Sequence, residues 1–176
     1  MQAHVDDQNV EALVVDFYHF YGNANSYLCS PGWYRSEARI IKNSVRSYAP
    51  DGLFWLVLDR NKKGRYPKAK HTAVHCYHYG WIRSEDEMNL KSEKVQKYWS
   101  AKPVKIDYSQ MDQSIIKQFS GTHPAVVHDW LPRAEGVFQV DQKYTLTKKQ
   151  KKHRIMLKLE KLFGLELSKK HFKLVK

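Results

Sequence analysis

Hydrophobic side chains dominate a segment close to the start of the chain, from Val10 to Tyr21 (VEALVVDFYHFY). Apolar residues occupy both of its alternating faces, whereas a strand that is exposed on one side alternates between apolar and polar residues. The pattern therefore predicts an interior β-strand that is buried between two layers. Because a central strand needs neighbours, we expect sheet strands on the N-terminal side of residue 1.

Shorter apolar runs predict further strands. Aromatic and β-branched residues indicate strands at Ala38–Lys42 and Leu53–Leu58, and a longer strand at Thr72–Trp81. Glycine, asparagine and proline predict a turn-rich connection over Gly22–Gly32. Residues 60–70 contain six Lys and Arg residues together with glycine and proline, which predicts an exposed loop, with anion binding as the alternative.

Start and stop signals predict helices in the second half of the chain. A serine followed three residues later by an acidic residue forms a capping box, and this spacing occurs at Ser84 and Ser109. We therefore expect one helix at 85–99 and another from Ser109 to Gly121, since glycine suits the left-handed end of a helix. Pro124 is expected to open a further short helix.

The last predicted helix begins at Thr147 and ends at Gly164. Its apolar residues recur at helical spacing and form one stripe, which consists of Ile155, Leu159, Leu162 and Phe163. We expect this stripe to pack against the helix's own domain, with the surrounding lysines facing outward.

Charge is concentrated at the C-terminal end of the sequence. The net charge is +12, and residues 142–176 hold twelve Lys and Arg against two Glu, a net of 12 − 2 = +10. Residues 1–141 contribute the remaining +2. We therefore predict two parts, a main domain at 1–141 and a basic amphipathic helical tail at 142–176. The tail suits an anionic membrane surface, and the ordinary charge balance of the main domain argues against nucleic acid as the main partner.

Two cysteines are too few for a disulfide framework and are compatible with a reducing compartment. No run of about 18 apolar residues could span a bilayer, and no signal-peptide pattern opens the chain. The predicted location is cytoplasmic, with peripheral attachment to a membrane as a second option.

Nine histidines raise the question of a metal site. His71 and His75 lie four residues apart on a predicted strand, about 13 Å, which is too far for two imidazoles to bind one ion directly. His78 can act as a single ligand among carboxylates or phosphates supplied from elsewhere, or as a hydrogen-bonded structural histidine. The acidic residues at 85–87 are explained by helix capping, and no Asp-x-Asp or glycine-rich phosphate loop occurs.

Two aromatic residues are followed by an arginine in Trp33-Tyr34-Arg35, and Arg39 lies four residues further along the chain. Aromatic faces can stack on a sugar, and guanidinium groups can bind phosphate or carboxylate oxygens with two hydrogen bonds. The alternative is an arginine whose aliphatic stem covers a packed aromatic ring.

Five separated stretches resemble bacterial family 2-like glycosyltransferases of the GT-A fold, and they occur in the family's order over nearly the whole chain. They are YHFYGN at 18–23, WYRSEARIIKN at 33–43, YHYGWIR at 77–83, FSGTHPAVV at 119–127 and LEKLFGLEL at 159–167. The resemblance implies an α/β fold with a partial GT-A-type mixed sheet followed by C-terminal helices. Residues 1–141 would be the acceptor-side part of that domain.

In that family a nucleotide-binding half comes first, and it carries the acidic motif that holds a divalent metal, Mn or Mg, and the diphosphate of the nucleotide sugar. The resemblance implies that this half is missing here, so we expect the chain to be incomplete as an enzyme by itself. His78 would contribute to the metal or diphosphate site. Arg35 and Arg83 would neutralise the leaving diphosphate, and Trp33, Tyr34 and Trp81 would form a stacking wall for sugar.

Two functions follow as hypotheses. In the first, the chain completes a site that moves a sugar from a nucleotide-sugar donor to a hydroxyl of a glycan or lipid-linked acceptor, with no catalytic residue assigned. In the second, it is a non-catalytic basic module that binds anionic lipid or nucleic acid through residues 142–176.

Overall fold

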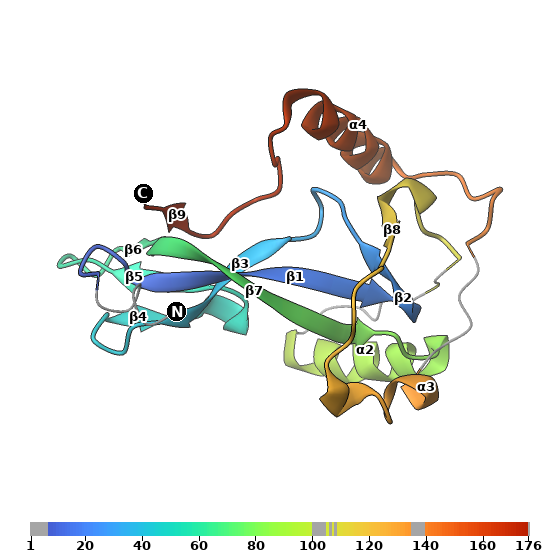
Figure 1. Cartoon of the computed structure of the whole chain (residues 1–176), viewed down its shortest axis with the longest axis horizontal. Helices are drawn as coiled ribbons and strands as arrows, with labels where there is room; N and C mark the ends of the chain where they lie inside the picture. The colour runs from blue at the N-terminus through green and yellow to red at the C-terminus, as the bar shows by residue number, and fades with distance from the viewer. Residues whose placement is uncertain (1–6, 100–104, 106, 108, 135–139, 176) are drawn as a thin grey trace. The chain divides into compact units, whose positions relative to one another are not determined.

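The computed structural model of the protein describes residues 7–99, 105, 107, 109–134 and 140–175 (Figure 1). The chain forms two compact units, each built from segments that are distant in the sequence. Unit 1 consists of Met1–Phe17, Tyr34–Cys76 and Ser168–Lys176. Unit 2 consists of Tyr18–Trp33 and Tyr77–Leu167. Two long strands, β1 (Ala12–Tyr21) and β7 (Lys68–Trp81), contribute residues to both units.

The main sheet is mixed, with the strand order β8-β2-β1-β7-β9 and with β3 also paired to β1. Its remaining strands are β2 (Asn23–Leu28), β3 (Ser36–Ile41), β8 (Ile116–Gln118) and β9 (Lys173–Leu174). β2 and β3 are antiparallel to β1, whereas β9 runs parallel to β7. Two longer helices, α2 (Glu85–Trp99) and α4 (Lys148–Phe163), complete an α/β fold, which confirms the predicted class.

β1 confirms the prediction of an interior strand. It lies between β2 and β7 in the sheet, and all of its residues except Asp16 and Tyr18 are buried. Its neighbours are strands of this chain, so the expectation that they lie on the N-terminal side of residue 1 is wrong. Both alternating faces are therefore covered, as the continuous apolar pattern indicated. The pairing shifts by one residue near each end of the strand, between Leu13 and Val14 and between Phe20 and Tyr21. These irregularities change which side chains face each partner strand.

The predicted turn over Gly22–Gly32 is wrong for most of its length. Gly22 adopts a φ of +73°, which glycine tolerates because it lacks a Cβ, and the chain then returns along β1 as β2. The turn residues therefore mark a tight hairpin connection and not a long loop.

The predicted helix from Ser109 to Gly121 is also wrong. Asp112 does act as a cap, because its carboxylate accepts a hydrogen bond from the Ser114 amide at 2.9 Å, but only a single 3-10 turn (Gln113–Ile115) follows. The next three residues form β8, which pairs with β2. Hydrogen bonds to a strand that lies far away in the sequence outweigh the local helix signal here.

Unit 1 contains a second, three-stranded sheet formed by β4 (Ser47–Tyr48), β5 (Leu56–Leu58) and β6 (Gly64–Arg65). β6 and the start of β7 occupy part of the stretch predicted as a loop at 60–70, so that prediction is only partly right. An ion pair accounts for the difference: Arg65 Nη1 donates to Glu11 Oε2 at 2.7 Å, and the Lys68 amide donates to the same oxygen at 2.8 Å.

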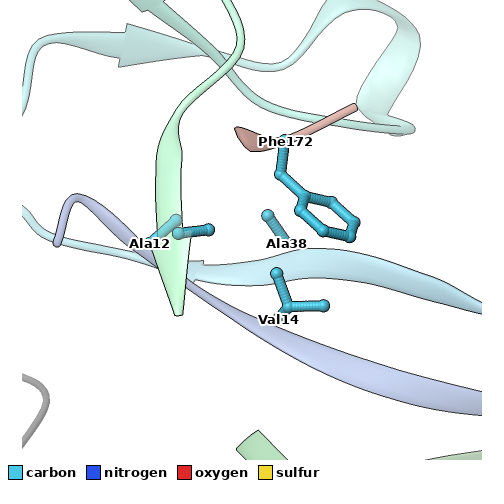
Figure 2. Close-up of a cluster of buried hydrophobic side chains, with 5 residues drawn as sticks. Ala12, Val14, Ala38 and Phe172 are labelled. Atoms are coloured by element: carbon cyan, nitrogen blue, oxygen red, sulfur yellow. The ribbon is translucent and has the colours of Figure 1, made fainter. Parts of the chain in front are cut away.

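The core of unit 1 is small and apolar. Figure 2 shows Val14, Ala38 and Phe172 directed toward one another, with Ala12 beside them. Ala69 completes this group of buried residues, and Ile41 and Trp55 pack against it. Phe172 is 6% exposed, so the segment that ends the chain supplies the largest side chain of this core.

Unit 2 contains two apolar clusters. Tyr21, Leu28, Met88 and Ile115 form the first of them, and Phe20, Ala24, Ile82 and Leu131 form the second. α2 begins as predicted, because Ser84 and Glu87 form the expected capping box with bonds of 3.2 and 3.3 Å. The short helix expected after Pro124 is present as a 3-10 turn (Ala125–Val127), followed by α3 (Leu131–Ala134).

α4 confirms both predicted ends. Thr147 caps its N-terminus in a capping box with Gln150, and Gly164 closes it with a φ of +64°. The expected packing of its apolar stripe is wrong, because Ile155, Leu162 and Phe163 are exposed. None of the helices in the described ranges is long and apolar enough to cross a bilayer.

Candidate functional site

Two histidines from neighbouring strands meet in unit 2. His19 of β1 and His78 of β7 place their Nδ1 atoms 3.0 Å apart, with the rings nearly perpendicular at 81°. His19 is 1% exposed, so its ring nitrogens need hydrogen-bonding partners within the protein. Because a hydrogen bond needs one donor and one acceptor, one Nδ1 carries the proton and the other accepts it. The two rings are therefore locked in different tautomers or share an added proton.

Two tryptophans adjoin this histidine pair. The Trp33 ring lies 5.5 Å from the His19 ring and 5.5 Å from the Trp81 ring, with the two indoles edge to face at 87°. Tyr21 stacks on Trp81 at 6.1 Å. Three of the predicted site residues, Trp33, His78 and Trp81, thus belong to one aromatic cluster. We call these three residues and His19 the His-Trp cluster.

Both tryptophans are only partly buried, which suits a wall that stacks against a ligand ring. Arg83 lies two residues beyond Trp81, exposed in the turn between β7 and α2. Its charge is therefore available to solvent at the strand end that carries the His-Trp cluster.

The other predicted site residues, Tyr34, Arg35 and Arg39, belong to unit 1. The Arg39 guanidinium lies 5.1 Å from the centroid of Phe17 and 5.5 Å from that of Tyr34, which is a cation-π arrangement. It also donates to the Tyr34 hydroxyl and to the Leu53 carbonyl, each at 3.2 Å. Arg35 is held by its backbone, whose carbonyl accepts from the Phe17 amide at 2.8 Å.

These contacts show that Arg39 is already tied to aromatic rings and a carbonyl of its own unit. That geometry resembles the alternative in which an arginine covers packed aromatics, and it leaves fewer guanidinium donors for a ligand. A stacking role for Tyr34 and an anion-binding role for Arg35 and Arg39 stay predictions.

A second histidine site of unit 2 was missed by the sequence reasoning. The Tyr79 hydroxyl lies 2.9 Å from Nδ1 of His123, and Nε2 of His123 lies 3.0 Å from the carbonyl oxygen of Ala24. Burial, with a smaller contribution from Tyr77, raises the pKa of Tyr79 to about 12. The motif at 119–127 contains His123, but only the fold shows that this histidine contacts Tyr79 of β7.

Unit 1 also gathers a carboxylate and two imidazoles. His71 Nε2 lies 2.9 Å and His75 Nε2 lies 3.9 Å from the two oxygens of Asp16. The two rings thus bracket one carboxylate although they lie four residues apart on β7. Within the part of the chain that the structure describes, no three His, Cys, Asp or Glu side chains are arranged to hold a metal ion.

Comparisons of the chain with family models, with curated proteins and with solved structures found no match.

Proposed function

We propose that the chain is the acceptor-side, C-terminal part of a family 2-like glycosyltransferase with a GT-A-type sheet. It would help to move a sugar from a nucleotide-sugar donor to a hydroxyl of a glycan or lipid-linked acceptor. The observation that carries the proposal is the convergence of three family-like motifs on the His-Trp cluster. His19 comes from YHFYGN, Trp33 opens WYRSEARIIKN, and YHYGWIR supplies both His78 and Trp81.

The chemistry of the cluster supports a site for sugar and phosphate. Indole faces present apolar, polarisable surface to the C–H groups of a sugar ring, and neighbouring imidazoles supply hydrogen bonds to its hydroxyls. Arg83 of the same unit is the cation proposed to offset charge on the leaving diphosphate, and the same role for Arg35, which belongs to unit 1, stays a prediction. Convergence of motifs that lie about 60 residues apart in the sequence, such as those of His19 and His78, is the feature expected of a ligand site.

A divalent ion, Mn or Mg, fits the residues of this chain only in part. With Nδ1 of His78 engaged by His19, Nε2 is the ring atom that would contribute one ligand. Such ions prefer oxygen ligands, so the donor diphosphate and the carboxylates of the expected nucleotide-binding half would supply the rest. When bound, the ion would neutralise diphosphate charge. We assign no catalytic base.

Saccharide binding tests the part of the proposal that this chain can perform by itself. Oligosaccharide acceptors titrated into the protein should change its tryptophan fluorescence. Trp33→Leu and Trp81→Leu should weaken the apparent affinity by about fivefold to tenfold, because each loses one stacking face. Trp130→Leu is the matched control, since Trp130 is a partly exposed tryptophan that packs on Tyr79 in the same unit.

Equal affinity in the Trp33, Trp81 and Trp130 variants would remove the basis for a sugar wall at the His-Trp cluster. Calorimetry with nucleotide sugar and manganese is the second measurement. Tight donor binding by this chain alone would contradict the proposal that the donor-binding half lies elsewhere.

The alternative function is a non-catalytic basic module that acts through residues 142–176. The observation that favours a binding surface there is the exposure of the apolar stripe on α4. This alternative function does not depend on the glycosyltransferase proposal.

A further inference from the structure

α4 presents an apolar stripe to solvent. Ile155, Leu162 and Phe163 are 60%, 74% and 64% exposed, and Leu159 between them is 41% exposed. Beyond the end of the helix, Leu165 is also 62% exposed. A contiguous exposed group of this kind marks an interaction surface more often than isolated apolar residues do.

The opposite face of α4 is fixed to unit 2, so the exposure of the stripe is a consequence of how the helix is anchored. Leu157 packs against the Ile115 cluster, and Arg154 makes a two-point ion pair with buried Asp112 at 2.6 and 3.1 Å. Glu160 is buried as well, and its carboxylate accepts a hydrogen bond from the Leu167 amide at 2.6 Å. These contacts prevent the helix from rotating its apolar residues inward.

Cations flank the apolar stripe. α4 holds seven Lys and Arg residues against one Glu, a net of 7 − 1 = +6. Lys148, Lys151 and Lys152 share the outward face by helical spacing. On one flank, a cleft of about 430 Å³ is lined by Gln113, Ser114, Arg154, Leu157, Lys158 and Lys161. The one acid of α4, Glu160, is buried, and Glu166 lies in the segment after the helix.

We propose that the outward face of α4 docks on an anionic phospholipid surface. The apolar stripe enters the boundary between headgroups and acyl chains, and the lysines meet lipid phosphates at the level of the headgroups. Lys158 and Lys161, which line the cleft beside the helix, are two of the cations that would meet such phosphates.

Two features favour a lipid surface over the other polyanions and over a protein. A nucleic acid offers phosphates but no apolar layer, so four large exposed apolar side chains would gain nothing from it. The centre of a protein interface is depleted of lysine, whereas lysines surround this stripe on its helix. An interface helix that lies in a membrane plane combines leucine and phenylalanine on one face with lysine around it.

Vesicle co-sedimentation of the full chain tests the docking. Wild-type protein should pellet with vesicles of phosphatidylcholine mixed with phosphatidylglycerol and stay in solution with phosphatidylcholine alone. Leu162→Ser/Phe163→Ser should lower the partition coefficient by about tenfold, because it removes the two most exposed apolar side chains of the stripe and no charge. Lys158→Gln/Lys161→Gln should lower it by about tenfold at low salt and by less at high salt.

Leu90→Ser is the matched control, because Leu90 is a 58% exposed leucine on another helix of unit 2. It should bind vesicles as the wild type does. Circular dichroism should show unchanged helix content in all variants, since every altered side chain is exposed.

Three outcomes would overturn the proposal. One is equal binding to neutral and anionic vesicles, and another is an equal loss in the Leu90 and the Leu162/Phe163 variants. The third is tight binding of a duplex oligonucleotide by the wild type and the Leu162/Phe163 variant without any vesicle binding, which would assign the cations to nucleic acid. None of these results depends on transferase activity.

Discussion

At the scale of single side chains, the hydrogen bonds of His123 determine its tautomer. The Ala24 carbonyl can only accept, so Nε2 of His123 carries the proton and Nδ1 accepts from the Tyr79 hydroxyl. That arrangement requires Tyr79 to stay neutral, and burial raises its pKa to about 12 in the same direction. The pair therefore links β7 to the segment after β8 through one defined proton arrangement.

Tyr79→Phe should lower the free energy of unfolding by about 1 to 2 kcal/mol, because it leaves Nδ1 of His123 without its donor. Urea unfolding measures this, and Tyr48→Phe, at a 44% exposed tyrosine, is the control that should change little. In an alkaline titration followed by near-ultraviolet absorbance, Tyr79→Phe should remove a tyrosine that ionises near pH 12.

The sign of the pH effect follows from the raised pKa of Tyr79. The unfolded chain ionises this tyrosine near its ordinary value of 10.0, and the folded protein does so near 12. The stabilisation is thus complete below pH 10 and is lost as the pH rises toward 12. An unchanged alkaline titration in Tyr79→Phe would contradict this assignment.

His153 on α4 should give the opposite pH dependence. Its ring lies so close to Gly32 that a Cβ at that position would collide with it. Burial, followed by repulsion from Lys149 and Lys152, lowers its pKa below 6.5. The unfolded chain therefore gains a proton near pH 6.5 that the folded protein resists, so stability should fall as the pH drops below 6.5.

Urea unfolding at a series of pH values tests this prediction for His153. His153→Gln should flatten the dependence between neutral and mildly acidic pH, since glutamine does not titrate. His128→Gln, which alters an exposed histidine of the same unit, should keep the wild-type slope. If both variants keep that slope, another group causes the acid sensitivity.

At the scale of the elements, α4 depends on its cap more than most helices do. Three lysines, at 148, 149 and 151, lie in its first turn, where the helix dipole disfavours positive charge. The capping box offsets this: the Gln150 amide donates to Thr147 Oγ1 at 3.2 Å, and the Thr147 amide donates to Gln150 Oε1 at 2.8 Å.

Thr147→Ala should therefore destabilise the protein by about 1 kcal/mol, since it leaves the Gln150 amide without the hydroxyl of its cap. Chemical unfolding followed by helix ellipticity measures the loss. Thr145→Ala, at an exposed threonine outside the helix, is the matched control and should change stability by less than about 0.5 kcal/mol. Equal losses in both variants would show that the cap is unimportant.

The elements that were predicted correctly are those whose signals are local. β1 follows from a continuous apolar run, and α2 and α4 follow from capping residues within one turn of their starts. β8 was missed because its partner β2 lies far earlier in the sequence, whereas β2 was missed because turn-forming residues at 22–25 obscure its strand pattern. Asp112 illustrates the conflict: the helix start was expected at Ser109, but Asp112 itself caps a single 3-10 turn, Arg154 of α4 also binds it, and β8 follows at once.

The candidate site was predictable as a set of residues and not as an arrangement. Trp33, His78 and Trp81 were selected from motifs, and the structure brings them together, but their partner His19 was not selected. His19 lies in an apolar run, where a histidine gives no sign that another histidine faces it. Likewise, the exposure of the apolar stripe on α4 depends on which face Asp112 and the Ile115 cluster hold.

At the scale of the whole molecule, each unit depends on chain segments from distant parts of the sequence. Residues 168–176 return to unit 1, where β9 pairs with β7 and the Lys173 amide donates to the Pro67 carbonyl at 2.9 Å. His171 Nδ1 lies 2.7 Å from the buried carboxylate of Glu37, and the His171 ring stacks on the ring of Phe54. The fold of unit 1 therefore requires the last residues of the sequence as well as the first strand.

Phe172 gives the sharpest test of that requirement. Phe172→Ala should lower the free energy of unfolding by about 3 to 5 kcal/mol, because it removes the largest side chain from the core of Val14 and Ala38 and leaves a cavity (Figure 2). Leu174→Ala, two residues later in β9 and 54% exposed, should cost about 0.5 kcal/mol or less. Urea unfolding compares the two. Equal small losses would mean that unit 1 folds without its C-terminal segment, and the contrast expected here would show that the segment is part of its core.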